Sequence, residues 1–257
     1  MEMSNIMKLK GKIALIPGGT AGIGEQIALA FAREGATVIV ASRNQERVDR
    51  VSKAIKAIGT GGGLVADITK KDQVDKMISQ VVKEYGKVDI MLNSAGFYPA
   101  TPVTQISPEE WQMVMDINLT GPFYCAQAAA KEMVKQKYGR IIFITSGQGL
   151  RGVPLMAHYS GAKGGLIALA RAMAAELGPY GITVNTIAAG LTTTDMVNNN
   201  LPPQLLEAVA QNVPVKRLAV PEEYNGAAIL LASEDGSYIT GETLAVDGGS
   251  VNADAVH

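Results

Sequence analysis

The sequence predicts an α/β protein with one doubly wound domain, in which a seven-stranded parallel sheet has helices on both faces. Short runs rich in β-branched apolar residues alternate with segments whose apolar residues recur at helical spacing. The runs lack polar alternation, as expected of strands buried on both faces. The predicted strands span residues 12–17, 37–42, 63–67, 88–93, 140–146, 182–187 and 243–247.

The segments between these strands are predicted helices, and several of them end at a glycine, the usual C-terminal stop. Strict alternation of strand and helix implies right-handed crossovers. No linker or repeat divides the chain, so residues 1–257 are expected to form one domain. The stretch 190–220 is rich in Asn and Pro and breaks the pattern, which predicts a substrate lid. The predicted helical segments span residues 24–35, 44–59, 70–86, 107–136 and 162–181.

The composition excludes several classes of function. Lys and Arg number 23 against 24 Asp and Glu, so no basic excess indicates a nucleic-acid partner. No apolar run reaches the roughly 18 residues of a membrane span, and the first one ends at Pro17, too early for a signal peptide. The single cysteine, Cys125, cannot form an internal disulfide. We therefore expect a cytoplasmic protein with no membrane partner, and no metal site is predicted.

A glycine-rich stretch, IPGGTAGIGEQ, follows the first predicted strand and opens the first predicted helix. In a doubly wound fold this is where a helix N-terminus binds phosphate. A Walker loop is excluded, because Glu25 and Gln26 stand where Lys and Ser or Thr are needed. The strict G-x-G-x-x-G pattern is also absent, since the glycines are Gly18, Gly22 and Gly24. A plain tight turn is the alternative to a dinucleotide loop.

The end of the second strand bears on the choice of dinucleotide. An acidic residue there selects NAD, and a basic residue favours the 2′-phosphate of NADP. Here Ser42 and Arg43 follow the strand, with no acidic residue before Glu46. This predicts NADP (NADPH) as the cofactor. NAD stays as the alternative, because Arg43 is also compatible with an ordinary surface position.

A tyrosine and a lysine four residues apart, Tyr159 and Lys163, share one face of a predicted helix start. A nearby ammonium favours the phenolate and lowers the pKa of a tyrosine. Such a phenol can exchange a proton with a carbonyl or an alcohol. A surface Tyr/Lys pair is the alternative interpretation of an isolated motif. His158 points away from Tyr159 on a helix, so we expect it in a pocket wall or at the surface.

Over nearly its whole length the chain resembles the short-chain dehydrogenase/reductase family. Residues 17–24 resemble its Thr-Gly-x-x-x-Gly-Ile-Gly loop, 93–96 its Asn-Asn-Ala-Gly segment, and 189–194 its Pro-Gly-x-x-x-Thr segment. The family's catalytic tetrad is matched, in the same order and with similar spacing, by Asn118, Ser146, Tyr159 and Lys163. The resemblance implies a Rossmann-type fold and an NAD(P)-dependent oxidoreductase that interconverts a ketone and a secondary alcohol.

The resemblance also implies a role for each matched residue. Tyr159 would be the general acid–base, and Lys163 would hold the nicotinamide ribose and depress the pKa of Tyr159. Ser146 would bind the substrate oxygen. Asn118 would lie at a helix irregularity and hold a water. The expected cofactor-binding residues are Gly18, Thr20, Gly22, Ile23, Gly24, Ser42, Arg43, Asp67, Ile68, Asn93, Ala95, Gly96, Tyr159, Lys163, Gly190, Thr192 and Thr194.

Three positions depart from the family pattern: Pro17 replaces Thr, Ser94 replaces the second Asn, and Ala189 replaces Pro. In the family the Thr hydroxyl ties the first strand to the Asn-Asn-Ala-Gly segment. Pro17 has neither that hydroxyl nor a backbone donor. We expect cofactor binding to persist with a different brace for the loop.

The substrate is expected to be a small uncharged cyclic, aryl or aliphatic carbonyl compound or alcohol. Leu150, Val153, Tyr98 and Met196 are the predicted pocket residues. The alternative is a 3-oxoacyl-[acyl-carrier-protein] reductase, which resembles this chain but often has two basic residues near the cleft. Lys137 and Tyr180 stand at those positions, half of the pattern. A less favoured alternative is a non-catalytic NADP-binding protein.

The oligomeric state is also predicted from the resemblance. Family members are commonly tetramers that pack the helices after the fourth and fifth strands. Alanine-rich stretches in both of these helices allow close approach, so we expect a homotetramer.

Overall fold

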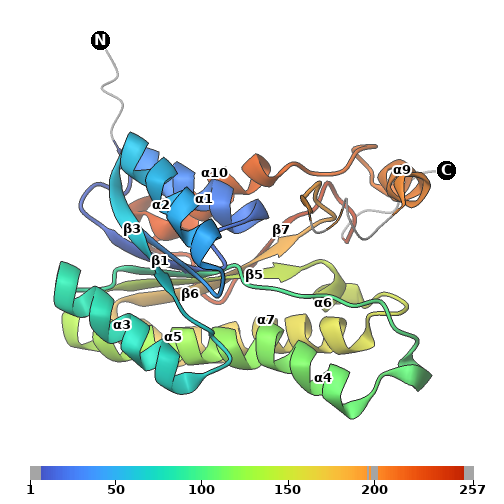
Figure 1. The fold of residues 1–257 in the computed structure, drawn as a ribbon, viewed down its shortest axis with the longest axis horizontal. Helices are drawn as coiled ribbons and strands as arrows, with labels where there is room; N and C mark the ends of the chain where they lie inside the picture. Colours follow the sequence, from blue (N-terminus) through green and yellow to red (C-terminus); the bar gives the residue numbers. More distant parts are fainter. Residues whose placement is uncertain (1–6, 196, 198–201, 252–257) are drawn as a thin grey trace, which may run out of the picture.

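The computed structural model describes residues 7–195, 197 and 202–251, and its centre is one sheet of seven parallel strands (Figure 1). The strand order is β3-β2-β1-β4-β5-β6-β7, so the order reverses between β1 and β4. This confirms the predicted Rossmann-type fold. The strands are β1 (Ile13–Pro17), β2 (Thr37–Ser42), β3 (Thr60–Val65), β4 (Ile90–Asn93), β5 (Gly139–Ser146), β6 (Ile182–Ala189) and β7 (Thr243–Val246).

Helices cover both faces of the sheet and enclose an apolar core on each side. In Figure 1, α1, α2 and α10 lie above the sheet, and α3, α5 and α7 lie below it. The α-helices are α1 (Gly22–Arg33), α2 (Gln45–Ile58), α3 (Lys71–Tyr85), α4 (Pro108–Met115), α5 (Gly121–Gln136), α6 (Gln148–Arg151), α7 (Ala157–Leu177), α9 (Pro203–Asn212) and α10 (Asn225–Ala232). Short 3₁₀ turns span Val103–Gln105, Gly178–Tyr180, Pro221–Tyr224 and Glu234–Gly236.

The predicted third strand, 63–67, is wrong in position, since β3 begins at Thr60 and ends at Val65. Three consecutive glycines are typical of a turn, yet Gly61, Gly62 and Gly63 pair in register with β2. A Cβ at Gly61 would lie 1.9 Å from the carbonyl oxygen of Val38. Glycine is therefore required by a close strand approach, which a single sequence does not display.

The predicted helix 107–136 is divided by a π-helical segment, Asp116–Thr120, between α4 and α5. The N–H of Gly121 donates to the carbonyl of Asp116, five residues earlier. Pro122 follows at the start of α5, where its missing donor would interrupt a regular α-helix. The wider turn carries Asn118, the residue expected at a helix irregularity.

The sixth strand is longer than predicted, because it continues to Ala189 and not only to residue 187. Ala189 pairs with Ser146 of β5 and Val246 of β7. An alanine has the backbone donor that the family's proline lacks, so the ladder can continue to this point.

Candidate active site

The glycine loop packs against the end of β4 at the point where the strand order reverses. Gly18 adopts φ +78°, and a Cβ there would lie 2.3 Å from the amide nitrogen of Ala95. Ala21, the N-cap of α1, makes no side-chain capping bond. The first-turn amides of α1 therefore lack a side-chain acceptor, and together with the helix dipole they suit an anion such as a pyrophosphate.

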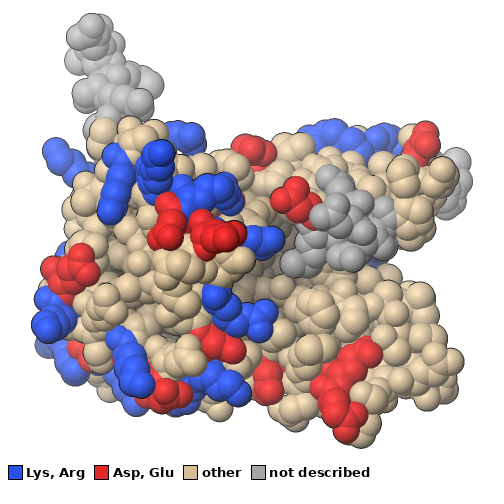
Figure 2. Space-filling view, in the orientation of Figure 1, with Lys and Arg blue, Asp and Glu red and all other residues tan. Residues whose placement is uncertain are grey.

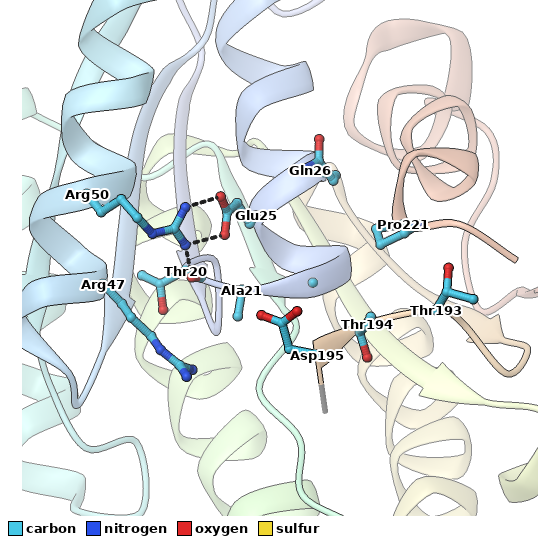
Figure 3. A pocket seen from close by; sticks show the side chains of 11 residues that line it. Thr20, Ala21, Glu25, Gln26, Arg47, Arg50, Thr193, Thr194, Asp195 and Pro221 are labelled. Atoms are coloured by element: carbon cyan, nitrogen blue, oxygen red, sulfur yellow. Dashed lines mark hydrogen bonds and ion pairs between the residues drawn. The ribbon is translucent and has the colours of Figure 1, made fainter. Parts of the chain in front are cut away.

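Beside this loop is a pocket of about 420 Å³ between α1, α2 and the segment after β6 (Figure 3). Arg50 of α2 binds both carboxylate oxygens of Glu25 at 2.6 Å and donates to the Thr20 carbonyl at 3.0 Å. Arg47, one turn earlier, extends toward the same hollow (Figure 3). Sequence reasoning missed both arginines. Their spacing on the helix after β2 was the available signal.

The charges are unevenly distributed on this face of the protein. Figure 2 shows most of the Lys and Arg side chains of this face over the α1–α3 side of a central hollow, interspersed with Asp and Glu, whereas a group of acidic side chains lies over α4. A phosphate-bearing ligand is therefore favoured on the α1–α3 side.

The residues expected near the adenosine are placed as follows. Arg43 is exposed, and the hydroxyl of Ser42 accepts from the amide of Asn44 at 3.3 Å. Asp67 uses Oδ1 to accept from the amide and hydroxyl of Thr69 at 2.9 and 2.8 Å. Ile68 is buried against Gly121. The structure thus positions Ser42 and Asp67 by local turns, and their cofactor contacts stay predictions.

The replacement of Thr by Pro17 has a visible consequence. The β1–β4 pairing covers only Ala14 and Leu15, while the β1–β2 pairing reaches Pro17. Continued by two residues, the β1–β4 register places Pro17 beside Asn93. Both polar side-chain atoms of Asn93 are buried and have no partner among the described residues. The loop is braced instead by the Ser94 amide, which donates to the Pro17 carbonyl at 2.9 Å, and by Arg50.

The variant Pro17→Thr is expected to raise the free energy of unfolding by about 1 kcal/mol, because its hydroxyl can pair with Asn93. NADPH affinity should change only modestly, since the phosphate-facing amides are untouched. Urea unfolding and cofactor titration measure the two effects. A complete loss or gain of activity would show that residue 17 is more than structural.

Asn118 is fully buried and joins the π-helical segment to the chain after β4. Its Nδ2 donates to the carbonyls of Phe97 at 2.7 Å and Val114 at 3.0 Å. Its Oδ1 accepts from the Phe97 amide at 3.2 Å. The side chain is therefore engaged with protein backbone, and the water-holding role stays a prediction.

Ser146, Tyr159 and Lys163 come together below the carboxyl end of β5. Ser146 ends β5, where its hydroxyl accepts from the Gln148 amide at 3.2 Å, and it is near enough to Tyr159 in the first turn of α7 to influence the pKa of that phenol. Lys163 lies one turn later, with Nζ 5.7 Å from the Tyr159 ring centroid. It is almost fully buried and donates to the carbonyl of Ile144 at 3.0 Å.

The electrostatics of this cluster correct one expectation. Burial raises the pKa of Tyr159 to about 12, although the Ser146 hydrogen bond opposes the rise. Lys163 was expected to depress the pKa of Tyr159, but its ammonium donates to the Ile144 carbonyl, and the Tyr159 pKa is governed by burial of the phenol. Burial also lowers the pKa of Lys163 to about 8. At neutral pH Tyr159 therefore holds its proton and Lys163 is largely charged.

The lowered pKa of Lys163 predicts a pH-dependent stability. Between its folded pKa of about 8 and its ordinary value of 10.5, the unfolded chain binds more protons than the folded one. Unfolding free energy should thus rise between pH 8 and 10, by on the order of 2 kcal/mol. The raised pKa of Tyr159 affects the unfolding free energy only above pH 10. Urea unfolding of the parent and Lys163→Met checks this, and an equal rise in both would contradict it.

His158 is neither a surface residue nor directed at the reacting centre, which corrects part of the expectation. It is fully buried, and its Nε2 lies 2.9 Å from Oε1 of Glu110 on α4. Its Nδ1 accepts from the Tyr159 amide at 3.0 Å. The neutral tautomer with its proton on Nε2 satisfies both contacts. The contact of His158 with Glu110, a partner that sequence reasoning missed, ties α4 to the start of α7.

The segment after β6 approaches the glycine loop. Thr194 lies 3.1 Å from a Cβ placed on Gly22. The hydroxyl of Thr192 is nearly buried, and it donates to the Gly190 carbonyl at 3.0 Å and contacts the Tyr224 hydroxyl at 2.7 Å. Thr192 thus holds the segment in shape, while Thr194 and Gly190 stay candidates for the cofactor.

The predicted substrate pocket is only partly assembled by described residues. Tyr98 is partly buried against the Tyr159 ring, with centroids 5.7 Å apart. Val153 is partly buried, whereas Leu150 is 40% exposed. Met196 lies outside the described residues, as does part of the predicted lid, 190–220. The described part of this segment includes α9.

Two residues expected near the cleft lie elsewhere in this chain. Lys137 precedes β5 and Tyr180 precedes β6, at the amino ends of strands whose carboxyl ends carry Ser146 and Ala189. An eight-residue strand spans roughly 23 Å. Within one chain, Lys137 and Tyr180 therefore lie far from Ser146, and they cannot act as the residues near the cleft that the carrier-protein reductases have.

In the described part of the chain, no helix is long and apolar enough to span a membrane. A family model described as "Enoyl-(Acyl carrier protein) reductase" matches residues 18–251. The chain is 39% identical over 249 residues to a 3-oxoacyl-[acyl-carrier-protein] reductase of Synechocystis, covering 95% of this chain and 98% of the relative. It is 38% identical to a 3alpha-hydroxysteroid dehydrogenase of Mediterraneibacter gnavus, with 94% and 98% covered. An actinorhodin polyketide ketoreductase solved with NADPH superimposes with a TM-score of 0.91, at 29% identity and with 94% and 98% covered.

Proposed function

Because the chain belongs to the short-chain dehydrogenase/reductase family, we propose that it is an NADP(H)-dependent oxidoreductase that interconverts a ketone and a secondary alcohol. Its substrate would be a small uncharged cyclic, aryl or aliphatic compound. The observation that carries the proposal is the cluster of buried Ser146 and Lys163 with partly buried Tyr159, next to the segment after β4 that packs on the glycine loop.

The bound nicotinamide would supply the hydride in reduction and take it up in oxidation. The protonated hydroxyl of Tyr159 would donate its proton to the carbonyl oxygen as that oxygen becomes an alcohol. Ser146 would donate a hydrogen bond to the same oxygen and stabilise its developing charge. Lys163 would hold a ribose hydroxyl and keep positive charge near Tyr159. Asn118 would keep the chain after β4 in place.

The site fits a dinucleotide phosphate. The uncapped start of α1 and the close approach of Gly18 suit the pyrophosphate. Arg43 is exposed at the end of β2, and Arg47 extends toward the pocket beside Thr20. These cations support a preference for the 2′-phosphate of NADP over NAD. The NADPH bound to the related ketoreductase agrees with this choice.

The segment 190–220 would close over the substrate as a lid, and the chain would assemble as a homotetramer. Most alanines of α5 are buried within the chain, so they do not support assembly. On α7, however, Ala168, Ala172 and Ala175 are exposed at helical spacing and leave room for a second helix. A 3-oxoacyl-[acyl-carrier-protein] reductase is the second candidate function, supported by the relative from Synechocystis.

A substrate screen with NADPH and NADH in parallel tests the proposal. The panel includes cyclic, aryl and aliphatic ketones and a 3-oxoacyl thioester, and cofactor oxidation is followed by absorbance. We expect turnover of small ketones with NADPH preferred. A strong NADH preference would contradict the cofactor assignment, and binding of NADPH without turnover of any substrate would favour a non-catalytic protein.

A further inference from the structure

Four side chains at one end of the sheet have a buried polar atom without a hydrogen-bond partner in the described part of the chain. Asn93 ends β4, Tyr98 follows it, Gln148 follows β5, and Ser160 adjoins Tyr159. Native proteins pair most buried polar atoms, so unpaired ones near a site indicate groups that serve a ligand. Tyr98 is the one whose ring packs against Tyr159.

The place of Tyr98 is determined by contacts on both sides of it. The preceding residue, Phe97, is held through its amide and its carbonyl by the side chain of Asn118. Three residues later, the amide of Thr101 donates to the carbonyl of Leu155 at 2.8 Å. The Tyr98 ring meets the Tyr159 ring edge to face, at an interplanar angle of 62°. The phenol is therefore presented in a defined position.

The chemical state of Tyr98 makes it a donor. Burial raises the pKa of Tyr98, so its hydroxyl keeps its proton at neutral pH. A charge on Tyr98 would in turn raise the pKa of Tyr159, which reflects the proximity of the two groups. Since Ser146 and Tyr159 serve the reacting oxygen in the proposed function, the Tyr98 hydroxyl is left for another acceptor.

We propose that Tyr98 is a specificity-determining residue whose hydroxyl donates a hydrogen bond to a second oxygen of the substrate. The preferred substrates are then ketones, or the matching alcohols, that carry another carbonyl or hydroxyl oxygen one or two carbons from the reacting carbon. The two tyrosine rings are in contact, with centroids 5.7 Å apart, so both phenols can serve atoms of one small substrate. This inference rests on the proposed function and narrows its substrate class.

A plain ketone leaves the Tyr98 hydroxyl unpaired, as it is in the free protein, so only a substrate with the second oxygen gains this hydrogen bond and the faster turnover that it supports. Sites built to hydrogen-bond a polar group discriminate strongly against analogues that lack it. The mostly apolar lining expected from Leu150 and Val153 then serves the carbon skeleton, while Tyr98 selects the second oxygen.

The test uses matched substrate pairs: cyclohexane-1,2-dione with cyclohexanone, and ethyl 3-oxobutanoate with pentan-2-one. The parent, Tyr98→Phe and Tyr138→Phe are compared by kcat/KM with NADPH. Tyr138 is the matched control, because its hydroxyl is also buried without a described partner but lies before β5. We expect Tyr98→Phe to lower kcat/KM about tenfold or more for the dioxygenated member and less than about twofold for the plain ketone.

Taking the ratio of variant to parent cancels the intrinsic reactivity of each substrate. An equal loss on both members of a pair, or no loss on either, would overturn the inference while leaving the proposed function intact. A weakened NADPH affinity with uniform loss would assign Tyr98 to the cofactor and also overturn it. If the parent turns over no member of any pair, the proposed function fails and this inference fails with it.

Discussion

Replacing Tyr159 by phenylalanine is expected to lower kcat for ketone reduction by about two to four orders of magnitude, the usual share of a positioned acid–base group. Phenylalanine keeps the ring that packs on Tyr98 and removes only the hydroxyl. Because burial keeps Tyr159 protonated, the lost group is the proton donor of the reduction. NADPH binding should be nearly unchanged, since the amides of the glycine loop are unaffected.

The measurement combines steady-state kinetics with a fluorescence titration of NADPH. Tyr138→Phe is a suitable control, because it deletes another buried hydroxyl that lies away from Ser146 and Lys163. If Tyr159→Phe turns over within about twofold of the parent, the assignment of Tyr159 fails. If both kcat and cofactor affinity collapse, the residue has a structural role that the contacts in the apo site do not indicate.

The second large effect is expected from Gly18→Ala. A Cβ there would lie 2.3 Å from the Ala95 nitrogen and 2.6 Å from the Ser94 carbonyl carbon. Backbone on both sides must move, which displaces the glycine loop from β4. We expect loss of measurable NADPH binding and a decrease of several kcal/mol in unfolding free energy, the sum of steric overlap and about 1–2 kcal/mol of left-handed strain.

Gly11 separates these two contributions. It has φ +75°, nearly the same as Gly18, but a Cβ there meets nothing within 4 Å. Gly11→Ala should therefore show only the strain of the backbone conformation, and cofactor binding should persist. Urea unfolding and NADPH titration of both variants provide the comparison. Equal destabilisation in the two variants would contradict the role assigned to the close approach of Gly18 and Ala95.

Several features of the site follow from local patterns. The Gly18, Gly22 and Gly24 spacing between a strand and a helix predicted where a phosphate could bind, and the structure has the uncapped start of α1 at that point. The order of Ser146, Tyr159 and Lys163 predicted their meeting, because β5 and α7 belong to one βα unit with only the short α6 between them. Such patterns are visible in a single sequence, since neighbours along the chain are also neighbours in space.

Other features depend on contacts between distant segments. Arg50 reaches Glu25 and Thr20 from another helix, and His158 is buried because Glu110 of α4 lies opposite it. The π-helical segment between α4 and α5 lets Asn118 hold the residue before Tyr98. Nothing in the local sequence specifies these partners.

By itself, the sequence determined the alternating α/β architecture, the glycine-rich turn before α1 and the Tyr159–Lys163 pair, because each depends on apolar periodicity or fixed spacing within a short segment. The tertiary structure alone decided the protonation state of this pair and the exposure of its neighbours. Burial raises the pKa of Tyr159 and lowers that of Lys163, and burial is a property of the packed chain. The tertiary structure also decided that β3 needs glycine at position 61, because the Val38 carbonyl leaves no room there for a side chain.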